Sequence, residues 1–371
     1  MRLPRALHPG AWWLWALGLA TAASRTTNPL LLGLIAAVLA YVVAARRTDA
    51  PWAQGFKVYW YLGLVVIGIR VLFRMLLDGQ YGAHILFTLP EVPLPAAAAG
   101  IRIGGPVSLE GLLAALYDGL RLAVLLLCVG AANVLANPKR LLKAMPAALH
   151  EIGVAVTVAL SVAPQLIESG QRVRAARRLR GEPGRGFHVF REIALPVMTD
   201  ALDRSLLLAS AMDARGYGRS AAVARPLRAT TEALLLGGLI GIGIGTYGLL
   251  DSTAPRTLGL PMLLGGVAAG WAGMVLSGRR VSRSRYRPDP WEWEEWCVAG
   301  IGLLVASVVF TVSIVDPRAL HPVLFPLQWP ALPVVPALAV LLAALPAWIA
   351  PPVRLTATRL PEVEREREPV A

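Results

Sequence analysis

The sequence predicts an all-α, polytopic integral membrane protein with about eight transmembrane helices and two long cytoplasmic helices. Three observations support this fold class. Of the 371 residues, 56% are hydrophobic and 16% are charged, whereas a soluble chain is about half apolar and about a quarter charged. The apolar residues form long runs, as membrane spans require. The arginines and lysines lie mainly between these runs, which is typical of cytoplasmic loops.

A surplus of basic residues gives the chain a formal net charge of +13. Such a surplus can indicate nucleic-acid binding, but here most of it lies in segments between apolar runs, as the positive-inside rule describes. We therefore expect the lipid bilayer, and no nucleic acid, as a partner. Cys128 and Cys297 lie in or beside different apolar runs, so neither a disulfide framework nor a CxxC site is expected.

The first apolar run, residues 10–23, has two interpretations. Its basic start and small-residue end are similar to a signal peptide with a cleavage site. Trp12, Trp13 and Trp15, in contrast, suit a helix anchored at the membrane interface. Only the polar turn 24–29 separates this run from the next, so we expect the two runs to form a helical hairpin.

The third run carries charges near its end. Arg70, Arg74 and Asp78 recur at four-residue intervals and would lie on one helical face. We interpret them as an ion pair with a snorkelling arginine, and a functional site is the alternative. The Gly- and Pro-rich segment 78–107 predicts an external or re-entrant loop. The predicted spans are residues 10–23, 30–45, 59–77, 109–135, 233–250, 260–276, 297–315 and 332–349.

A long basic segment, residues 138–228, lies between the fourth and fifth spans. It contains fifteen Lys or Arg against seven Asp or Glu, which predicts a cytoplasmic location. Its first helix is predicted over residues 151–180, about 45 Å long at 1.5 Å per residue. This helix would leave the bilayer and lie along its cytoplasmic surface. The second is predicted over residues 187–215, kinked or divided at Pro196.

Both predicted helices end in an arginine followed by a glycine, at Arg180-Gly181 and Arg215-Gly216. Glycine suits a left-handed C-terminal cap, and an arginine in the last turn gains about 0.3–1 kcal/mol from the helix dipole. One such ending is ordinary capping. Two endings in one cytoplasmic segment favour a binding role. If the helices cross through small residues such as Ala211, they project two arginines whose forks bind carboxylates in acidic grooves of a partner.

Motifs for catalysis are absent from the sequence. It has no GxxxxGK[ST] phosphate loop, no HExxH zinc motif and no GxSxG nucleophile elbow. The glycines within 241–245 predict close helix packing. We expect no cofactor, metal site or catalytic residue. Two alternatives stay open: a polytopic membrane enzyme, for which Asp200 and Asp203 are the nearest candidates, and a secondary transporter, which should show inverted repeats.

The basic segment resembles the transmembrane T component of energy-coupling factor (ECF) transporters, the EcfT/CbiQ family. Ala214-Arg215-Gly216 matches the Ala-Arg-Gly motif that ends a coupling helix in this family. The resemblance covers about residues 8–250, so the last three spans lie beyond it. Further similar features are His8-Pro9, Thr27-Asn28-Pro29, Pro164-Gln165-Leu166-Ile167 and Leu195-Pro196.

The other coupling-helix motif is less regular. Arg180-Gly181 resembles it, but Leu179 stands where the family has alanine. Arg177 and Arg178 lie close enough to supply the motif arginine instead. The sequence leaves the assignment among these three arginines open.

The resemblance implies a non-catalytic coupling component of an ABC-type importer in the plasma membrane, with both termini cytoplasmic. It would pair with two ABC-type ATPase subunits, which hydrolyse ATP, and with a small substrate-binding membrane subunit, the S component, for uptake of a vitamin or a metal ion such as cobalt. The N-terminal spans and the coupling helices would contact the S component. The residues implied for ATPase coupling are Arg180, Gly181, Ala214, Arg215 and Gly216, supported by Arg177, Arg178, Ala211 and Asp213.

The predicted organisation has four parts. Residues 1–136 hold the N-terminal transmembrane helices, 137–230 the coupling-helix region, 231–350 the C-terminal transmembrane helices and 351–371 a charged tail. The tail alternates acidic and basic residues, which predicts a disordered or loosely helical segment.

Overall fold

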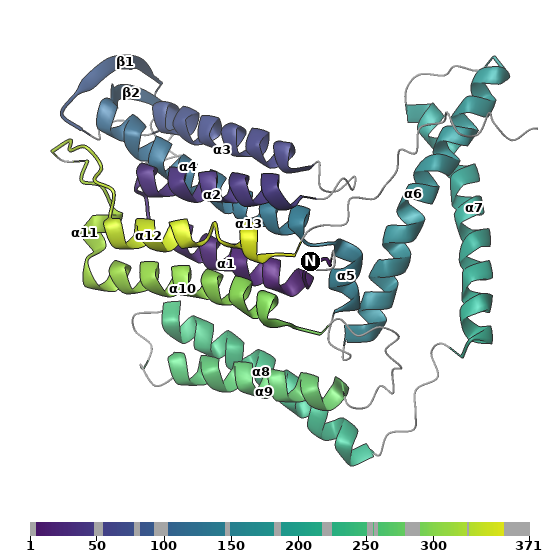
Figure 1. The fold of residues 1–371 in the computed structure, drawn as a ribbon. Helices are drawn as coiled ribbons and strands as arrows, with labels where there is room; N and C mark the ends of the chain where they lie inside the picture. Colours follow the sequence, from purple (N-terminus) through teal and green to yellow (C-terminus); the bar gives the residue numbers. More distant parts are fainter. Residues whose placement is uncertain are drawn as a thin grey trace, which may run out of the picture. The chain divides into compact units, whose positions relative to one another are not determined.

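A computed structural model describes residues 5–47, 55–77, 82–92, 103–144, 149–181, 187–216, 225–250, 255, 259–278, 290–324 and 326–351. The chain divides into two compact units, Met1–Leu141 with Asp289–Ala371, and Leu142–Pro288. Helices make up nearly all of the described part of each unit (Figure 1).

The first unit is a bundle of long helices with a small sheet at one end (Figure 1). α1 packs against α10 and α4, α2 packs against α4 and α12, and α3 packs against α4. The elements of this unit are α1 (Pro9–Ser24), α2 (Pro29–Arg46), α3 (Phe56–Leu77), β1 (Ile85–Val92), β2 (Ile103–Ser108), α4 (Leu109–Leu135), α10 (Trp293–Val315), α11 (Pro317–Leu320), α12 (Val334–Leu342) and α13 (Pro346–Ile349). The short helix α5 (Pro138–Lys143) spans the boundary between the two units along the chain.

Side-chain caps begin the first two helices. The Nδ1 atom of His8 accepts a hydrogen bond from Gly10 N at 3.1 Å, and the Oδ1 atom of Asn28 accepts one from Leu30 N at 3.0 Å. Such caps satisfy N–H groups that have no partner within the helix. A proline occupies the first turn of each helix, where its missing N–H costs nothing. α1 and α2 therefore follow one another across a short turn, as predicted.

The core corrects the prediction for two tryptophans of α1. Trp15 is fully buried, and its indole Nε1 donates a hydrogen bond to the Ala343 carbonyl at 3.2 Å. Trp12 is also buried and meets the Trp15 ring edge to face. These rings pack in the core instead of anchoring the helix at an interface, because a carbonyl inside the bundle satisfies the Trp15 indole N–H.

α1 and α10 approach each other at two glycines. A Cβ atom on Gly18 would lie 2.1 Å from the carbonyl oxygen of Gly302, and one on Gly302 would lie 2.5 Å from Cα of Trp15. Backbone this close leaves no room for a side chain. Helices α10–α13, from the predicted C-terminal group 231–350, thus pack in the same unit as α1–α4.

One of the arginines of α3 has an ion-pair partner on α4. The Nη2 atom of Arg70 lies 3.9 Å from Oδ2 of Asp118 on α4. Asp78, the predicted partner, lies outside the described residues. Because both side chains of the observed pair are about half exposed, this ion pair is at most a weak link between α3 and α4.

A two-stranded antiparallel sheet occupies part of the segment predicted as a loop. Phe87 of β1 lies opposite Val107 of β2, and Leu89 lies opposite Gly105. The start of β1 is fixed by the buried Glu110 at the beginning of α4, whose Oε1 lies 2.6 Å from Nδ1 of His84. The strands were not predicted because the Gly- and Pro-rich composition of this segment is typical of turns.

The second unit contains two pairs of helices (Figure 1). α6 (His150–Leu179) packs with α7 (Phe187–Ala214), and α8 (Arg225–Leu250) packs with α9 (Leu260–Gly278). α7 continues through Pro196 as one helix, so the predicted division there does not occur.

The α8–α9 pair packs through glycines, as predicted for residues 241–245. A Cβ atom on Gly241 would lie 2.9 Å from Cα of Gly266, and one on Gly245 would lie 2.4 Å from Leu263 N. Gly243 differs, because a Cβ atom there would meet no atom within 4 Å. Two of the three glycines therefore bring the helix backbones together.

Seven helices among the described residues are long and apolar enough to cross a membrane, which confirms the polytopic all-α membrane fold. Two predicted spans are not among them, because residues 10–23 lie in the 16-residue α1 and residues 332–349 are split between α12 and α13. The predicted cytoplasmic helix α6 does qualify, through its apolar first half. The seven are Pro29–Arg46, Phe56–Leu77, Leu109–Leu135, Ile152–Leu179, Ala229–Leu249, Leu260–Gly278 and Trp293–Val315.

Candidate functional site on α6 and α7

α6 and α7 form an antiparallel pair that is held together by polar side chains. The Arg204 Nη1 atom donates a hydrogen bond to Gln165 Oε1 at 3.2 Å, and Ser169 Oγ donates one to Asp200 Oδ2 at 2.7 Å. Arg177 and Glu192 form an ion pair nearer the connection between the helices. Residues later in α6 pair with residues earlier in α7, so the two helices run antiparallel.

Asp200 lies at the centre of this crossing. Besides Ser169, its carboxylate accepts a hydrogen bond from Arg204 Nε at 3.1 Å and lies 3.5 Å from Nη2 of Arg172. Ser169 itself is buried, so its hydroxyl depends on Asp200 as acceptor. The hydrogen bonds from Ser169 and then from Arg204 hold the pKa of Asp200 below its ordinary value near 3.8. At neutral pH, an ionised carboxylate therefore joins the two helices.

The position of the crossing differs from the prediction. Ala211 and Ala214 were expected to bring the helices together, but both are exposed and belong to the last turn of α7, after Asp200 and Arg204. The polar contacts of Asp200 and Arg204 fix the register instead. A four-residue interval joins these two residues on one face, so the sequence did contain a local sign of the cluster.

Both helices end in the predicted glycine cap. Arg180 N donates to the Ala176 carbonyl at 3.2 Å, and Gly181 follows with φ +79°. At the end of α7, Arg215 N donates to the Met212 carbonyl at 3.2 Å, and Gly216 has φ +75°. A positive φ is strained for any residue with a Cβ. The two glycines thus turn the chain sharply just after each arginine.

An arginine directly precedes the capping glycine at the end of each helix. The side chains of Arg180 and Arg215 are exposed and form no ion pair or hydrogen bond with the described residues. Arg178 is also exposed, and Leu179, which lies between Arg178 and Arg180, is 90% exposed. Arg177 is different, because its ion pair with Glu192 ties it to α7. Of the three candidate motif arginines, Arg177 is therefore engaged in a contact between α6 and α7.

Asp200 and Asp203, the two carboxylates considered for a membrane enzyme, have different surroundings in the structure. Asp200 is engaged by Ser169 and Arg204, whereas Asp203 is exposed on the same helix. The two do not share a site, because only Asp200 faces α6. The polar contacts of Asp200 fit a structural role.

Replacing Asp200 is expected to loosen the crossing. Asp200→Ala removes the acceptor of the buried Ser169 and the counter-charge of Arg172 and Arg204, so backbone amides near the crossing should exchange hydrogen several-fold faster. Asp203→Ala is the matched control and should leave exchange unchanged. Hydrogen exchange followed by mass spectrometry measures both.

The pH dependence of the crossing follows from the lowered pKa of Asp200. A carboxylate with a depressed pKa contributes stability above its unfolded value and loses it only as the pH falls through the folded value. The protection factor at the crossing, which is the intrinsic exchange rate of the unfolded chain divided by the observed rate, should therefore stay constant from about pH 8 to about pH 5 and fall only below about pH 4. A loss of protection centred near neutral pH would contradict this assignment.

The geometry defines a polytopic helical membrane protein in which two long basic helices cross and end in exposed, glycine-capped arginines. Residues 2–223 match the family model CbiQ, described as a cobalt transport protein. The chain belongs to the CbiQ family, which confirms the resemblance to the EcfT/CbiQ family. The match includes α6 and α7 with both endings and stops before α8.

One relative supports the same family. The "Energy-coupling factor transporter transmembrane protein EcfT" of Leuconostoc gelidum subsp. gasicomitatum is 28% identical over 195 residues. The alignment covers 48% of this chain and 67% of that protein. The chain is thus a multi-pass membrane protein of a transport family.

Proposed function

We propose that the chain is the transmembrane coupling component of an ECF-type importer. It transmits the ATP-driven movement of two ABC-type ATPase subunits to a small membrane S component, and the complex takes up a vitamin or a metal ion. The observation that carries the proposal is the pair of exposed, glycine-capped arginines, Arg180 and Arg215, inside the stretch that matches the CbiQ family. The name of the EcfT relative supports the same assignment.

The chemistry of the two arginines suits ATPase docking. A guanidinium presents a rigid fork that binds a carboxylate through two parallel hydrogen bonds. Gly181 and Gly216 turn the chain away immediately after each arginine, so a groove on a partner can close around each side chain. Two separate endings can serve two ATPase subunits, one each. Ala214 and Asp213 lie exposed beside Arg215 and would form the edge of that contact.

Transmission requires that the two helices move together. α6 has 30 residues and α7 has 28, which gives lengths of about 45 Å and about 42 Å. The charged crossing at Asp200 fixes their mutual angle, so force applied at the arginines reaches the far ends of both helices. Because of this crossing, the two helices would move together as one rigid body.

The proposed topology places both chain ends in the cytoplasm. Within the first unit, Arg46 at the end of α2 donates through Nε to the Ala347 carbonyl at 2.8 Å and through Nη1 to the Pro351 carbonyl at 3.1 Å. The last described residues therefore lie at the same end of the bundle as the end of α2, which is also where α1 begins. Arg5, Arg46 and Arg47 gather there, as the positive-inside rule predicts for a cytoplasmic face.

Photo-crosslinking tests the proposed docking sites. A photoreactive amino acid at position 179, which is highly exposed beside Arg180, or at position 213 beside Arg215 should crosslink ABC-type ATPases in the native membranes. The same group at Leu264, an exposed position on the apolar helix α9, is the control and should not. If neither 179 nor 213 yields an ATPase product, the proposed function loses its main support.

A further inference from the structure

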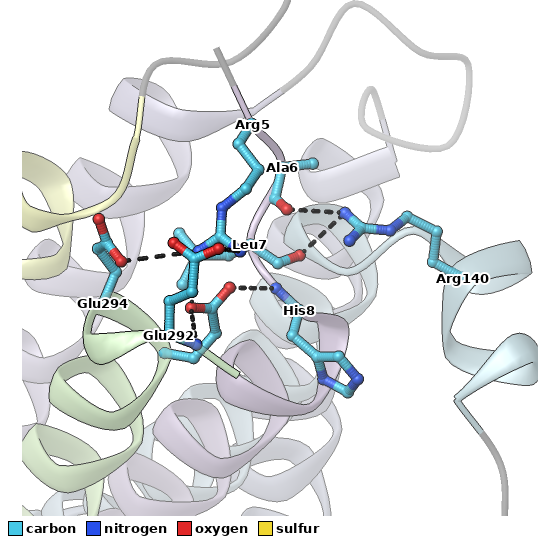
Figure 2. Close-up of polar contacts among 8 residues, drawn as sticks. Arg5, Ala6, Leu7, His8, Arg140, Glu292 and Glu294 are labelled. Carbon is cyan, nitrogen blue, oxygen red and sulfur yellow. Dashed lines mark hydrogen bonds and ion pairs between the residues drawn. The ribbon is translucent and has the colours of Figure 1, made fainter. Parts of the chain in front are cut away.

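A second polar cluster lies in the first unit, at the start of α10 (Figure 2). The Arg5 guanidinium lies 3.0 Å from a carboxylate oxygen of Glu292, 3.6 Å from Glu294 and 2.8 Å from Glu295. The Glu295 side chain is 1% exposed and that of Glu294 is 9% exposed. We call these four residues the amino-terminal clasp.

Glu295 organises the clasp. Its carboxylate accepts hydrogen bonds from His8 N at 3.2 Å and from Glu292 N at 3.1 Å, the latter as part of a capping box that begins α10. A buried carboxylate is strongly destabilising unless it is paired and hydrogen-bonded. Arg5 and the two backbone N–H groups provide this compensation, and the helix N-terminus adds a favourable dipole. The position of segment 5–8 on α10 is therefore specific.

The same segment also contacts α5. The Nη1 atom of Arg140 donates hydrogen bonds to the Ala6 carbonyl at 2.9 Å and the Leu7 carbonyl at 3.1 Å (Figure 2). α5 is a six-residue helix and the last described helix before α6 along the chain. Residues 5–8 thus connect α10, which begins beyond the family match, to the point where the chain leaves the first unit.

We propose that Arg140 and the amino-terminal clasp are positioning residues for coupling: they anchor α5 on α10, so that movement of α6 and α7 is transmitted to the membrane helices and is not absorbed at α5. This inference rests on the proposed function. A helix as short as α5 is marginal by itself, so an external anchor determines how firmly it is held. The later helices, which the family match does not cover, supply that anchor through Glu295.

The matched control is another arginine that donates to carbonyls in the same unit. Arg46 contacts the carbonyls of Ala347 and Pro351, but it does not touch the segment that holds α5. Arg140→Gln and Arg46→Gln therefore remove similar hydrogen bonds, and only the first releases α5. Arg140→Lys retains an N–H donor for the Ala6 and Leu7 carbonyls and should behave like the unmodified chain.

The test measures nucleotide-driven movement in the full complex purified with its ATPases. Spin labels are placed at Val58 and at Leu206 on α7, both exposed, with Cys128 and Cys297 replaced by alanine. The distance distribution between the labels is recorded without nucleotide and with ATP plus vanadate. We expect a nucleotide-dependent shift in the unmodified chain, its loss in Arg140→Gln, and its retention in Arg46→Gln and Arg140→Lys. Thermal unfolding is measured on each sample.

A second variant distinguishes loss of coupling from misfolding. Arg5→Gln alone leaves Glu295 buried without its counter-charge, so the double variant Arg5→Gln/Glu295→Gln, which keeps a hydrogen-bonding pair, is used instead. Because the ion pairs of Arg5 with Glu292, Glu294 and Glu295 are removed while Glu295 is not left ionised in the interior, this variant should also lose the nucleotide-dependent shift.

Two results would contradict the proposal that Arg140 and the clasp anchor α5. The first is an unchanged nucleotide-dependent shift in Arg140→Gln. The second is that Arg140→Gln and Arg46→Gln lose the shift and thermal stability to the same extent. If the unmodified chain recovers no ATPase, the proposed function fails and the anchor fails with it. If ATPases are recovered and the shift occurs in every variant, only the anchor fails.

Discussion

Reversing the charge of both capped arginines, with Arg180→Glu and Arg215→Glu together, is expected to abolish ATPase association and transport while leaving the chain folded and inserted. Both side chains are exposed and form no ion pair with the described residues, so the fold does not depend on them. Truncating one partner of a buried, hydrogen-bonded charge pair costs about 2–5 kcal/mol of binding free energy. Charge reversal adds repulsion to that loss. Co-purification of the ATPases and ATP-driven uptake measure the effect.

The single variants and a control sharpen this prediction. Arg215→Glu should uncouple the complex strongly, whereas Arg180→Glu should do less because the exposed Arg178 can replace it. Arg174→Glu, an exposed arginine farther from the end of α6, should leave association nearly unchanged. Normal association and transport in the Arg180/Arg215 double variant would remove these arginines from the coupling mechanism.

Filling the contact between α1 and α10 is expected to destabilise the first unit. Gly302→Ala places a Cβ atom 2.5 Å from Cα of Trp15 and 3.0 Å from the Leu14 carbonyl oxygen. These are backbone atoms and can move away only if the helices separate. Overpacking of this kind typically costs about 1–3 kcal/mol, which exceeds the gain of about 1 kcal/mol from replacing glycine in a helix. Thermal unfolding in detergent measures the loss.

The control for this prediction lies on the same helix. A Cβ atom on Gly300 would meet no atom within 4 Å, so Gly300→Ala should be neutral or slightly stabilising. If the two variants have the same midpoint of unfolding, the close approach of α1 and α10 is not a feature of the folded protein.

The sequence was sufficient for the features that local patterns encode. Long apolar runs indicated the membrane helices, and the glycines after Arg180 and Arg215 indicated left-handed caps, since few other residues adopt positive φ without strain. Close packing at Gly241 and Gly245 followed from the same reasoning about small residues. The family resemblance depended on the arginine-glycine endings, and the CbiQ match bears it out.

Pairings between distant residues could not be predicted in this way. No local pattern links Ser169 to Asp200, because their hydrogen bond appears only when α6 and α7 are antiparallel. Arg5 and Glu295 are 290 residues apart in the sequence, so no local pattern links them. The burial of Trp15 likewise depends on the carbonyl of Ala343, which belongs to a late element of the chain.

Within the candidate site, the structure separated residues that look equivalent in the sequence. Arg177 and Arg178 are adjacent, but their side chains leave the helix in different directions, about 100° apart. Only Arg177 therefore reaches Glu192 on α7. The role of Arg178, Arg180 and Arg215 in ATPase docking stays a prediction that the charge reversals test.

Purification of the tagged chain from its own membranes in mild detergent, followed by mass spectrometry, tests the coupling role most directly. The expected result is recovery of ABC-type ATPases and one small membrane protein, and the identity of that protein would indicate the substrate class. Recovery of the unmodified chain alone, monodisperse and without any ATPase, would contradict a coupling role.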